Sequence, residues 1–339
     1  MSFENKFKKS SAEIFDEFDK NKDGGLDFNE FQNLCKELFG ADEVEENESK
    51  VKSIFEIFDI NRDGLLKNEE WERCYNEWLQ VIMNPVNVLV IVDVQNDFIN
   101  GSLALSKCGE GEDGEEVIEP INRLIKEGVW KTIVYTQDWH PENHIGFFEN
   151  LHLRQLHPNS KVTKEKARLF DTVLFLEPKL EQRLWPVHCI MNSWGSQLHE
   201  RLFIAPNSQQ VRKGLNPDME TYSAFYDNNS INSTELLDIL RKHDVTDVYV
   251  CGLAYDVCVR ATCLDGLKLG YRLAIIEDCC RGVSRNDIVM SRKEISEKGG
   301  LISESNQVLS LVKDKKRSLI MAHQGAVALA KKWSAMSKN

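Results

Sequence analysis

Three side chains suited to nucleophilic catalysis follow three segments with the composition of buried strands. Asp93 follows the β-branched run 88–92, Lys213 lies at the end of a shorter probable strand, and Cys258 comes shortly after a third strand. The carboxyl ends of parallel strands meet at one edge of a sheet, so these side chains would lie together. A carboxylate can take the proton of a thiol, and a nearby ammonium favours both anions. The pattern predicts Cys258 as nucleophile, Asp93 as general base and Lys213 as the cation beside them.

Cys258 lies where a strand is expected to turn into a helix. A thiol at a helix N-terminus is close to free N–H groups and to the positive end of the helix dipole, so a lowered pKa is expected for Cys258. Taken alone, one cysteine among nine is more often a buried structural residue. Asp93 and Lys213 make the catalytic interpretation the stronger one.

A second set of polar residues belongs to the loop after the strand 132–135 and to a later segment. Asp138 and His140 lie in that loop, and His188 comes further along the chain. Carboxylate and imidazole groups are ligands that zinc and similar divalent ions prefer. An isolated Asp-x-His is more often an ordinary polar stretch of surface. Together with the catalytic segments, the three side chains predict a metal site at the same sheet edge.

The elements that must hold these residues alternate between strand and helix. Expected strands lie at 88–92, 131–136, 209–213, 247–252 and 271–277, and expected helices lie at 117–124, 233–243, 257–269 and 287–298. Such alternation predicts an α/β fold with a doubly wound, mainly parallel sheet and helices on both faces. Residues 145–184 are expected to form a long excursion over the site, and the tail at 324–334 a closing helix.

The first 84 residues predict a different, all-α unit. Two twelve-residue loops, 19–30 and 59–70, match the EF-hand calcium pattern, and apolar residues flank both at helical spacing. Lys67, in the ninth place of the second loop, is expected to weaken that site. The alternative is a decayed pair that keeps its fold and binds little. The expected ligands are Asp19, Asn21, Asp23, Gly25 and Glu30 in the first loop, and Asp59, Asn61, Asp63, Leu65 and Glu70 in the second.

Length and charge agree with two domains, 1–84 and 85–339. The 339-residue chain has a net charge of −12, and residues 1–85 hold 21 acidic against 11 basic side chains. No basic stripe interleaves with aromatic residues, so a nucleic-acid partner is not expected. The segment 1–6 lacks an apolar signal core, no run suits a membrane helix, and nine cysteines with one needed as a free thiol indicate a reducing compartment. The prediction is a cytoplasmic protein, with nuclear entry left open.

Five ordered blocks together resemble the nicotinamidases of the isochorismatase-like cysteine hydrolase superfamily. The blocks are 93–98, 138–140, 185–189, 213–214 and 258–260, and the resemblance runs from about residue 87 to about 312. Joined to an EF-hand pair, the chain resembles animal, insect-type nicotinamidases. The resemblance implies hydrolysis of nicotinamide to nicotinate and ammonia in NAD salvage. Ordered blocks of this kind are far more specific than any one motif alone.

The resemblance also implies roles for individual residues. Asp138, His140 and His188 would hold a metal that binds the pyridine nitrogen of the substrate, while His144 would be a further ligand or, as we favour, a partner of the ligands. The amides of Ala254 and Cys258 are the expected oxyanion donors, after a cis peptide at Leu253–Ala254. The expected substrate pocket consists of Phe98, Trp185 and Tyr222, for which plain core packing is the alternative.

Two other functions compete with nicotinamide hydrolysis. The first is another cysteine amidase or isochorismatase-like hydrolase, against which the Asp-Trp-His segment argues. The second is a calcium sensor with a vestigial hydrolase domain as scaffold, disfavoured because all three catalytic residues are intact. A sensor pair would expose an apolar groove to a calcium-dependent protein partner, with Phe15, Phe31, Phe55 and Trp71 as candidate lining. We expect the pair to pack on the hydrolase domain and stabilise it, and a homo-oligomer is a further expectation.

Overall fold

The larger lobe, named the catalytic lobe for the catalytic residues predicted in it, is built on a six-stranded parallel sheet. The computed structural model describes residues 9–108, 112–314 and 316–337, so the N-terminal segment judged above for a signal core lies outside the described residues. The strand order is β5-β2-β1-β6-β7-β8, and every neighbouring pair is parallel. The strands are β1 (Asn87–Val92), β2 (Thr132–Asp138), β5 (Gln209–Lys213), β6 (Asp247–Leu253), β7 (Arg272–Arg281) and β8 (Leu301–Ser303).

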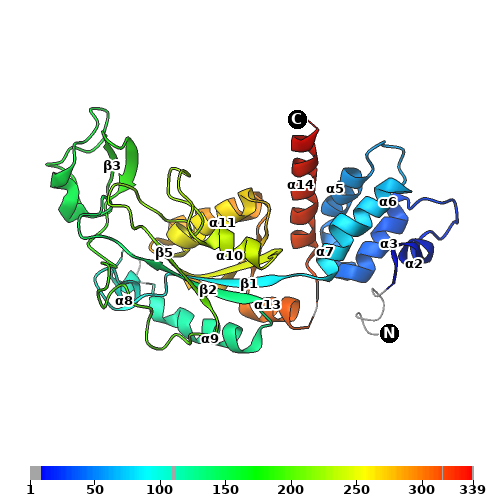
Figure 1. Cartoon of the computed structure of the whole chain (residues 1–339), viewed down its shortest axis with the longest axis horizontal. Helices are drawn as coiled ribbons and strands as arrows, with labels where there is room; N and C mark the ends of the chain where they lie inside the picture. Colours follow the sequence, from blue (N-terminus) through cyan, green and yellow to red (C-terminus); the bar gives the residue numbers. More distant parts are fainter. Residues whose placement is uncertain (1–8, 109–111, 315, 338–339) are drawn as a thin grey trace.

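Helices cover both faces of this sheet, which confirms the predicted doubly wound fold. Figure 1 shows α9 and α13 below the strands and α10 and α11 above them. β1 is fully buried, as a near-continuous apolar strand of a parallel sheet should be. β8 and α13 were not predicted separately. The helices are α8 (Asn96–Ile99), α9 (Ile118–Glu127), α10 (Leu236–Lys242), α11 (Arg260–Lys268), α12 (Arg285–Glu297) and α13 (Ser305–Val312).

The excursion between β2 and β5 has a small core of its own. It contains a 3₁₀ turn, η4 (Phe148–Leu153), and an antiparallel hairpin of β3 (Thr172–Phe175) and β4 (Leu180–Arg183). Ile145, Phe175 and neighbouring apolar side chains are buried between these elements. The excursion returns to the sheet through Trp185, whose N–H donates to the carbonyl of Gly146.

The N-terminal lobe is a pair of helix-loop-helix units. Leu26 and Leu66 exchange backbone hydrogen bonds of 3.0 and 2.9 Å, which join the two loops side by side. The last helical stretch runs without a break through α6, the π-helical η1 and α7 toward β1. The elements are α2 (Ser11–Phe18), α3 (Phe28–Phe39), α4 (Ala41–Glu46), α5 (Glu48–Phe58), α6 (Glu69–Arg73), η1 (Cys74–Leu79) and α7 (Gln80–Met83).

The C-terminal helix α14 (Leu319–Met336) stands between the two lobes (Figure 1). Leu319, Ala322 and Ala326 belong to the apolar core of the N-terminal lobe, whereas Met321 belongs to that of the catalytic lobe. β1 begins at Asn87, two residues after the predicted division, and α14 contributes side chains to both cores. Among the described helices, α14 included, none is both long and apolar enough to cross a bilayer.

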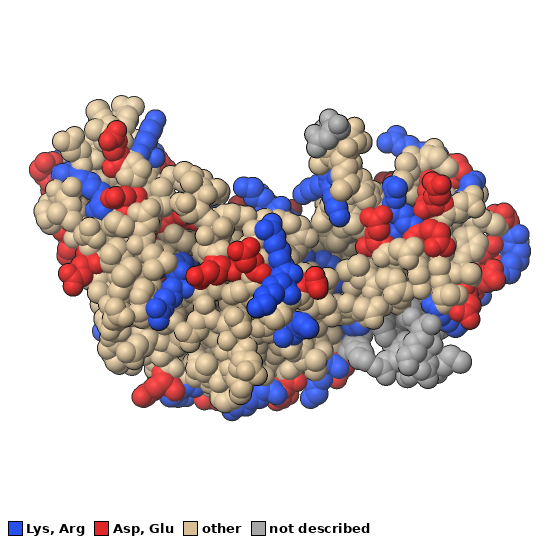
Figure 2. Space-filling view, in the orientation of Figure 1, with Lys and Arg blue, Asp and Glu red and all other residues tan. Residues whose placement is uncertain are grey.

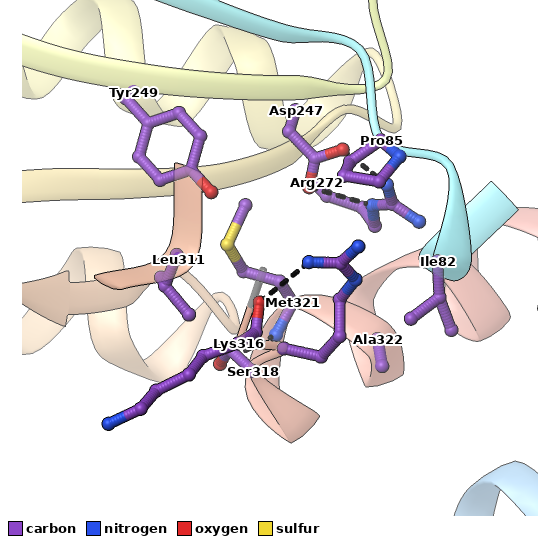
Figure 3. A pocket seen from close by; sticks show the side chains of 11 residues that line it. Ile82, Pro85, Asp247, Tyr249, Arg272, Leu311, Lys316, Ser318, Met321 and Ala322 are labelled. Atoms are coloured by element: carbon purple, nitrogen blue, oxygen red, sulfur yellow. Dashed lines mark hydrogen bonds and ion pairs between the residues drawn. The ribbon is translucent and has the colours of Figure 1, made fainter. Parts of the chain in front are cut away.

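A buried ion pair holds the junction between the lobes. Figure 3 shows Arg272 and Asp247 at the cleft where the chain passes from α7 to β1 and again from α13 to α14. Arg272 Nε lies 3.0 Å from Asp247 Oδ1, and its Nη2 also donates to the carbonyl of Val81 at 3.2 Å. Arg317 donates to the carbonyl of Met83 at 2.9 Å. Hydrogen bonds from the guanidinium groups of Arg272 and Arg317 thus fix the end of α7 at this junction.

We predict that Arg272→Met destabilises the protein strongly, because it leaves the Asp247 carboxylate buried without its partner. Removing one member of a buried pair costs about 3–5 kcal/mol of unfolding free energy. The matched control is Arg241→Met, whose partner Asp238 is 85% exposed. Breaking that surface pair is expected to cost less than about 1 kcal/mol. Urea unfolding followed by tryptophan fluorescence measures both, and equal losses would contradict the prediction.

Candidate active site

The three candidate catalytic residues meet at the point where the strand order reverses. Asp93 follows β1, Lys213 ends β5, and Cys258 lies in the π-helical turn η5 (Tyr255–Val259) that follows β6. β2 lies on one side of β1 and β6 on the other, so the carboxyl ends there border a crevice. Asp93 has a left-handed backbone with φ 49°, which turns the chain away from the strand. All three side chains are buried.

Lys213 is at the centre of the site. Its Nζ lies 2.9 Å from Asp93 Oδ2, 3.3 Å from Cys258 Sγ and 2.5 Å from Asp138 Oδ1. It also donates to the carbonyl of Thr221 at 3.1 Å. The register of β2 and β5 explains part of this, since Asp138 and Lys213 are paired on adjacent strands. One ammonium group therefore links the predicted catalytic residues to the predicted metal site.

Burial and charge set the protonation of these groups. Burial raises the pKa of Asp93 to about 6, with Lys213 opposing the shift and Asp138 adding to it. Burial alone would lower the pKa of Lys213, but Asp138 and Asp93 outweigh it and hold that pKa well above its usual range. At neutral pH the lysine is a permanent cation between two carboxylates. Asp93 is poised to exchange a proton.

The expected lowering of the thiol pKa at Cys258 is wrong. Burial raises the pKa of Cys258 well above its usual range, and Asp93 and Asp138 raise it further, while Lys213 opposes them. The residue lies in the first turn of a helical stretch that begins at Tyr255 as the π-helical η5 and continues as α11. The resting state is therefore a thiol in contact with a carboxylate. Its nucleophilicity depends on a base rather than on a preformed thiolate.

Thr136 is a site residue that the sequence analysis did not identify. Its hydroxyl donates to Asp93 Oδ1 at 2.6 Å, and its carbonyl accepts the N–H of Asp93 at 3.2 Å. With Oδ2 facing Lys213, these contacts fix the orientation of the carboxylate. Thr136 precedes the Asp138 motif by two residues. Period-two alternation along β2 would have placed its side chain on the same face as Asp138.

Asp138, His140 and His188 converge as a ligand set. Asp138 Oδ2 lies 3.6 Å from Nε2 of His140 and 3.8 Å from Nε2 of His188. Nδ1 of His140 is 3.0 Å from the carbonyl of Gly214, and Nδ1 of His188 is 2.8 Å from that of Pro186. Carbonyls only accept, so each Nδ1 carries its proton, and each Nε2 offers a lone pair once it is unprotonated. Burial alone would lower the pKa of His140, but Asp138 outweighs burial and raises that pKa. Two lone pairs and a carboxylate oxygen in one place suit a divalent cation.

Charge favours the same conclusion. Burial alone would raise the pKa of Asp138, but Lys213 and His140 hold it well below its usual range. Burial lowers the pKa of His188, and His140 lowers it further, so His188 is a neutral imidazole. Nε2 of His140 is buried and has no hydrogen-bond partner among the described residues. An anionic carboxylate and two imidazoles form a donor set that fits zinc and related ions.

Backbone contacts fix the loops that carry the histidines. The N–H of His140 donates to the carbonyl of Cys189 at 3.0 Å. Asp97 Oδ2 accepts the N–H of Cys189 at 2.7 Å. Gln95 Oε1 accepts the N–H of Asp138 at 2.8 Å, and its Nε2 donates to the carbonyl of the same residue at 2.9 Å. The polar residues of the first block thus position the second and third blocks.

His144 stacks on His140 with ring centroids 4.1 Å apart. Its Nδ1 accepts the N–H of Gly146 at 3.2 Å, and its Nε2 lies 3.3 Å from the carbonyl of Met219. Both nitrogens are engaged, which favours the supporting role over ligation. Glu220, a buried carboxylate close to both histidines, was not identified from the sequence, and no motif around it would have identified it.

Of the three aromatic residues expected to form a pocket, Phe98 contacts the ligand set, and Trp185 and Tyr222 contact each other. The ring of Phe98 lies 5.5 Å from that of His188. The indole N–H of Trp185 donates to the hydroxyl of Tyr222 at 2.9 Å, with the rings edge-on. Gln182, on the hairpin, also donates to that hydroxyl at 3.3 Å. The contacts of Trp185 and Gln182 fix the orientation of the Tyr222 ring.

The backbone before Cys258 has the form that the resemblance implies. The Leu253–Ala254 peptide is cis, and the carbonyl of Ala254 accepts the N–H groups of Val257 and Val259 at 3.0 and 3.1 Å. The strand therefore ends, turns and restarts as a helix within a few residues. The assignment of the Ala254 and Cys258 amides as oxyanion donors stays a prediction.

The two calcium loops have matching geometry. Glu30 Oε1 accepts the N–H of Lys20 at 2.7 Å, and Glu70 Oε1 accepts that of Ile60 at 2.9 Å. In the second loop Asp59, Asp63 and Glu70 gather within 4.8 Å of one another. Lys67 forms an ion pair of 2.6 Å with Asp63, which opposes ligation by that carboxylate. The weaker second site stays a prediction with this contact as its cause.

We predict that Gly214→Ala disrupts the ligand set. The new methyl carbon would lie 2.3 Å from the His140 ring, at a backbone φ of +71°. Gly214 is the hydrogen-bond partner of His140, and changing such a partner of a metal ligand lowers metal affinity or activity by roughly 10–100-fold. Gly299→Ala is the control, since it has φ +90° but only one contact, at 4.0 Å. Metal content after dialysis and thermal melting separate the two effects, and equal metal retention in both variants would contradict the prediction.

Comparison with known families and proteins divides the chain in the same way. The isochorismatase domain family matches residues 87–307, and the EF-hand domain pair matches residues 8–75. The nicotinamidase of Saccharomyces cerevisiae is 37% identical over 214 residues, which cover 61% of this chain and 93% of the yeast protein. The nicotinamidase of Escherichia coli is 37% identical over 203 residues, covering 59% of this chain and 85% of its own.

Solved structures agree with the sequence matches. The yeast nicotinamidase bound to the inhibitor nicotinaldehyde aligns with a TM-score of 0.55 and 32% identity, over 65% of this chain and all of that one. An Acinetobacter nicotinamidase aligns with a TM-score of 0.55 and 33% identity, over 66% of this chain and 97% of that one. Both alignments span about two thirds of this chain.

Proposed function

The chain belongs to the isochorismatase family, and we propose that it hydrolyses nicotinamide to nicotinate and ammonia. One observation carries the proposal: a single buried ammonium, that of Lys213, contacts Asp93, Cys258 and Asp138 at once. This contact supports a base and a thiol acting beside a ligand set whose metal would bind a ring nitrogen. Nicotinamidases from yeast and Escherichia coli align over nearly their full lengths. The product nicotinate would enter NAD salvage, and we place the reaction in the cytoplasm.

In the first half of the mechanism the thiol of Cys258 attacks the carboxamide carbon. Its proton passes to Asp93 as the S–C bond forms, because a thiol with a raised pKa is not ionised beforehand. The carbonyl oxygen becomes an oxyanion, which the N–H groups of Ala254 and Cys258 would receive. Asp93 then gives the proton to the nitrogen. The C–N bond breaks, and ammonia leaves behind a thioester.

In the second half a water molecule attacks the thioester. Asp93, again ionised, takes a proton from this water as the C–O bond forms. The C–S bond breaks, and the proton returns to the sulfur of Cys258 as nicotinate is released. Lys213 stays protonated throughout and stabilises whichever of its neighbours is anionic. Thr136 keeps the carboxylate facing the sulfur in both halves.

Asp138, His140 and His188 would hold zinc or a similar divalent ion, which would supply a Lewis-acid contact for the pyridine nitrogen. Phe98 and Trp185 would lie against the flat ring of the substrate, and Tyr222 is held by its bonds from Trp185 and Gln182. This orientation brings the carboxamide toward Cys258. His144 stacks on His140, and Glu220 lies close to both histidines, so these two residues would hold the ligand His140 in position.

Ammonia release from nicotinamide by the purified protein tests the function. Benzamide is the matched control substrate, because it has the same carboxamide but no ring nitrogen. We expect a kcat/KM for benzamide at least ~100-fold lower, in line with the loss of a contact that a polar site is built to make. Similar values for both amides would favour a different carboxamide as substrate. No release from either would favour a scaffold role for the catalytic lobe.

We predict that Cys258→Ala abolishes turnover and leaves the fold intact, since the nucleophile is lost and a small side chain remains. Removal of a nucleophile that acts within such a group costs on the order of 10⁴–10⁶ in kcat. Cys263→Ala is the control, a buried cysteine on α11 outside the site. It should retain activity. Steady-state ammonia release measures both, and turnover above a tenth of wild type in Cys258→Ala rejects the mechanism.

We predict that chelation inactivates the enzyme and that His188→Ala raises KM while kcat changes less. A contact with the pyridine nitrogen is made in both the ground state and the transition state. Its loss therefore weakens the binding of both states equally, which raises KM and leaves kcat nearly unchanged. The control is His199→Ala, which removes a buried histidine outside the ligand set. Zinc added back after chelation should restore activity. A normal KM in His188→Ala would indicate a purely structural histidine.

We also propose that the N-terminal pair binds calcium. Both loops carry the full set of expected ligands, and their pairing through Leu26 and Leu66 is that of a working EF-hand unit. The affinity expected for such loops is roughly 10⁻⁵ to 10⁻⁸ M. The ion pair between Lys67 and Asp63 makes the second loop the weaker one.

A further inference from the structure

One face of α14 fills the apolar core of the EF-hand pair. Leu319, Ala322, Ala326, Leu329 and Trp333 recur at spacings of three and four, which places them on one side of the helix. The first three are almost fully buried in the core of the N-terminal lobe, and the last two pack against it. This is the pattern by which an amphipathic helix lies in a hydrophobic groove.

Polar contacts fix the position of the helix along this groove. The indole N–H of Trp78 donates to the carbonyl of Ala322 at 2.9 Å, in the centre of the aromatic core. Trp333 lies 5.5 Å from the ring of Phe58 and donates to Glu77 at 3.0 Å. At the other end, Glu43 accepts the N–H of Leu319 at 2.7 Å. The helix is bound at both ends and in the middle.

The opposite face of α14 is fastened to the catalytic lobe. The side-chain amide of Gln324 accepts the N–H of Leu273 at 2.5 Å and donates to its carbonyl at 3.0 Å. It donates as well to the carbonyl of Gly299 at 2.6 Å. Leu273 lies on β7, beside the strand that leads to Cys258. A substituent on Gly325 would meet the side chain of Arg272 at 3.3 Å, so small residues allow this close approach.

We propose that α14 is the target helix of the EF-hand pair, bound within the same chain, and that calcium in the loops tightens its hold. The inference rests on the calcium binding proposed above. Calcium opens sensor pairs and exposes an apolar groove, and here the groove residues Phe31 and Phe55 share one core with α14. Because coupling is reciprocal, α14 must raise calcium affinity by the same factor that calcium raises the affinity for α14.

This assignment changes the role expected of the pair. A groove filled by the chain's own helix is not free for an external calcium-dependent partner. The calcium signal is instead delivered to the helix that holds the catalytic lobe by Gln324. The competing explanation is that α14 is an ordinary packing helix, bound equally well with and without calcium. Such a helix has no influence on calcium affinity.

The test is calcium titration of the full-length protein against a competing chelator dye. Trp333→Ala removes the aromatic anchor from the groove, and we expect its calcium dissociation constant to rise at least fivefold, the lower end of typical coupling. Ser334→Ala is the matched control, because Ser334 neighbours Trp333 but is exposed. Its dissociation constant should equal that of wild type. An unchanged constant in Trp333→Ala overturns the proposal.

A second measurement needs no variant. Hydrogen exchange of the wild-type protein should slow at least fivefold across residues 319–336 when calcium is added. Calcium binding without any change in this exchange overturns the coupling and leaves the calcium sites themselves intact. If the protein does not bind calcium, both the proposed calcium sites and their coupling to α14 are overturned. Neither result affects nicotinamide hydrolysis, which is assayed separately.

Discussion

The buried ammonium of Lys213 is the interaction on which the active site depends. Asp93 and Asp138 lie on opposite sides of it, and two carboxylates this close and this deeply buried would repel one another without a cation. The same charge faces the sulfur that must become an anion. Lys213 therefore allows the two carboxylates to lie close together, and under the proposed function it would also balance the charges of the proton acceptor and the ligand set during the reaction.

The histidines show how a ligand set is prepared by its surroundings. The carbonyls of Gly214 and Pro186 accept hydrogen bonds from the two Nδ1 atoms, so both Nε2 atoms face Asp138. Positive charge at this point, whether a proton on His140 or a bound cation, is stabilised by the carboxylate. The arrangement also connects the two halves of the site, since Gly214 follows Lys213 directly and its carbonyl orients His140. A change in the lysine strand would disturb the proton-transfer group and the ligand set together.

Much of this site could be predicted because its residues lie in short blocks at strand ends. Asp93 and Cys258 follow strands of plainly apolar composition, Lys213 ends a short strand of mixed composition, and parallel topology brings such ends together. The raised thiol pKa could not be predicted, because it depends on complete burial beside two carboxylates. Thr136 and Glu220 escaped notice for another reason. Their roles come from contacts across the fold, and a lone threonine or glutamate carries no motif.

The packing of α14 between the two lobes could not be predicted from the sequence either, and the reason is physical. A helix that packs on one side only shows an apolar stripe opposite a polar face. α14 packs on both sides, with Ala322 and Ala326 toward the EF-hand core and Gln324 and Gly325 toward β7. The apolar stripe toward the EF-hand core is present, but the second packed face carries Gln324 and Gly325 in place of charged residues, so the stripe has no plainly polar face opposite it. A helix that looks like a simple terminal cap is for that reason the structural link between the calcium loops and the catalytic sheet.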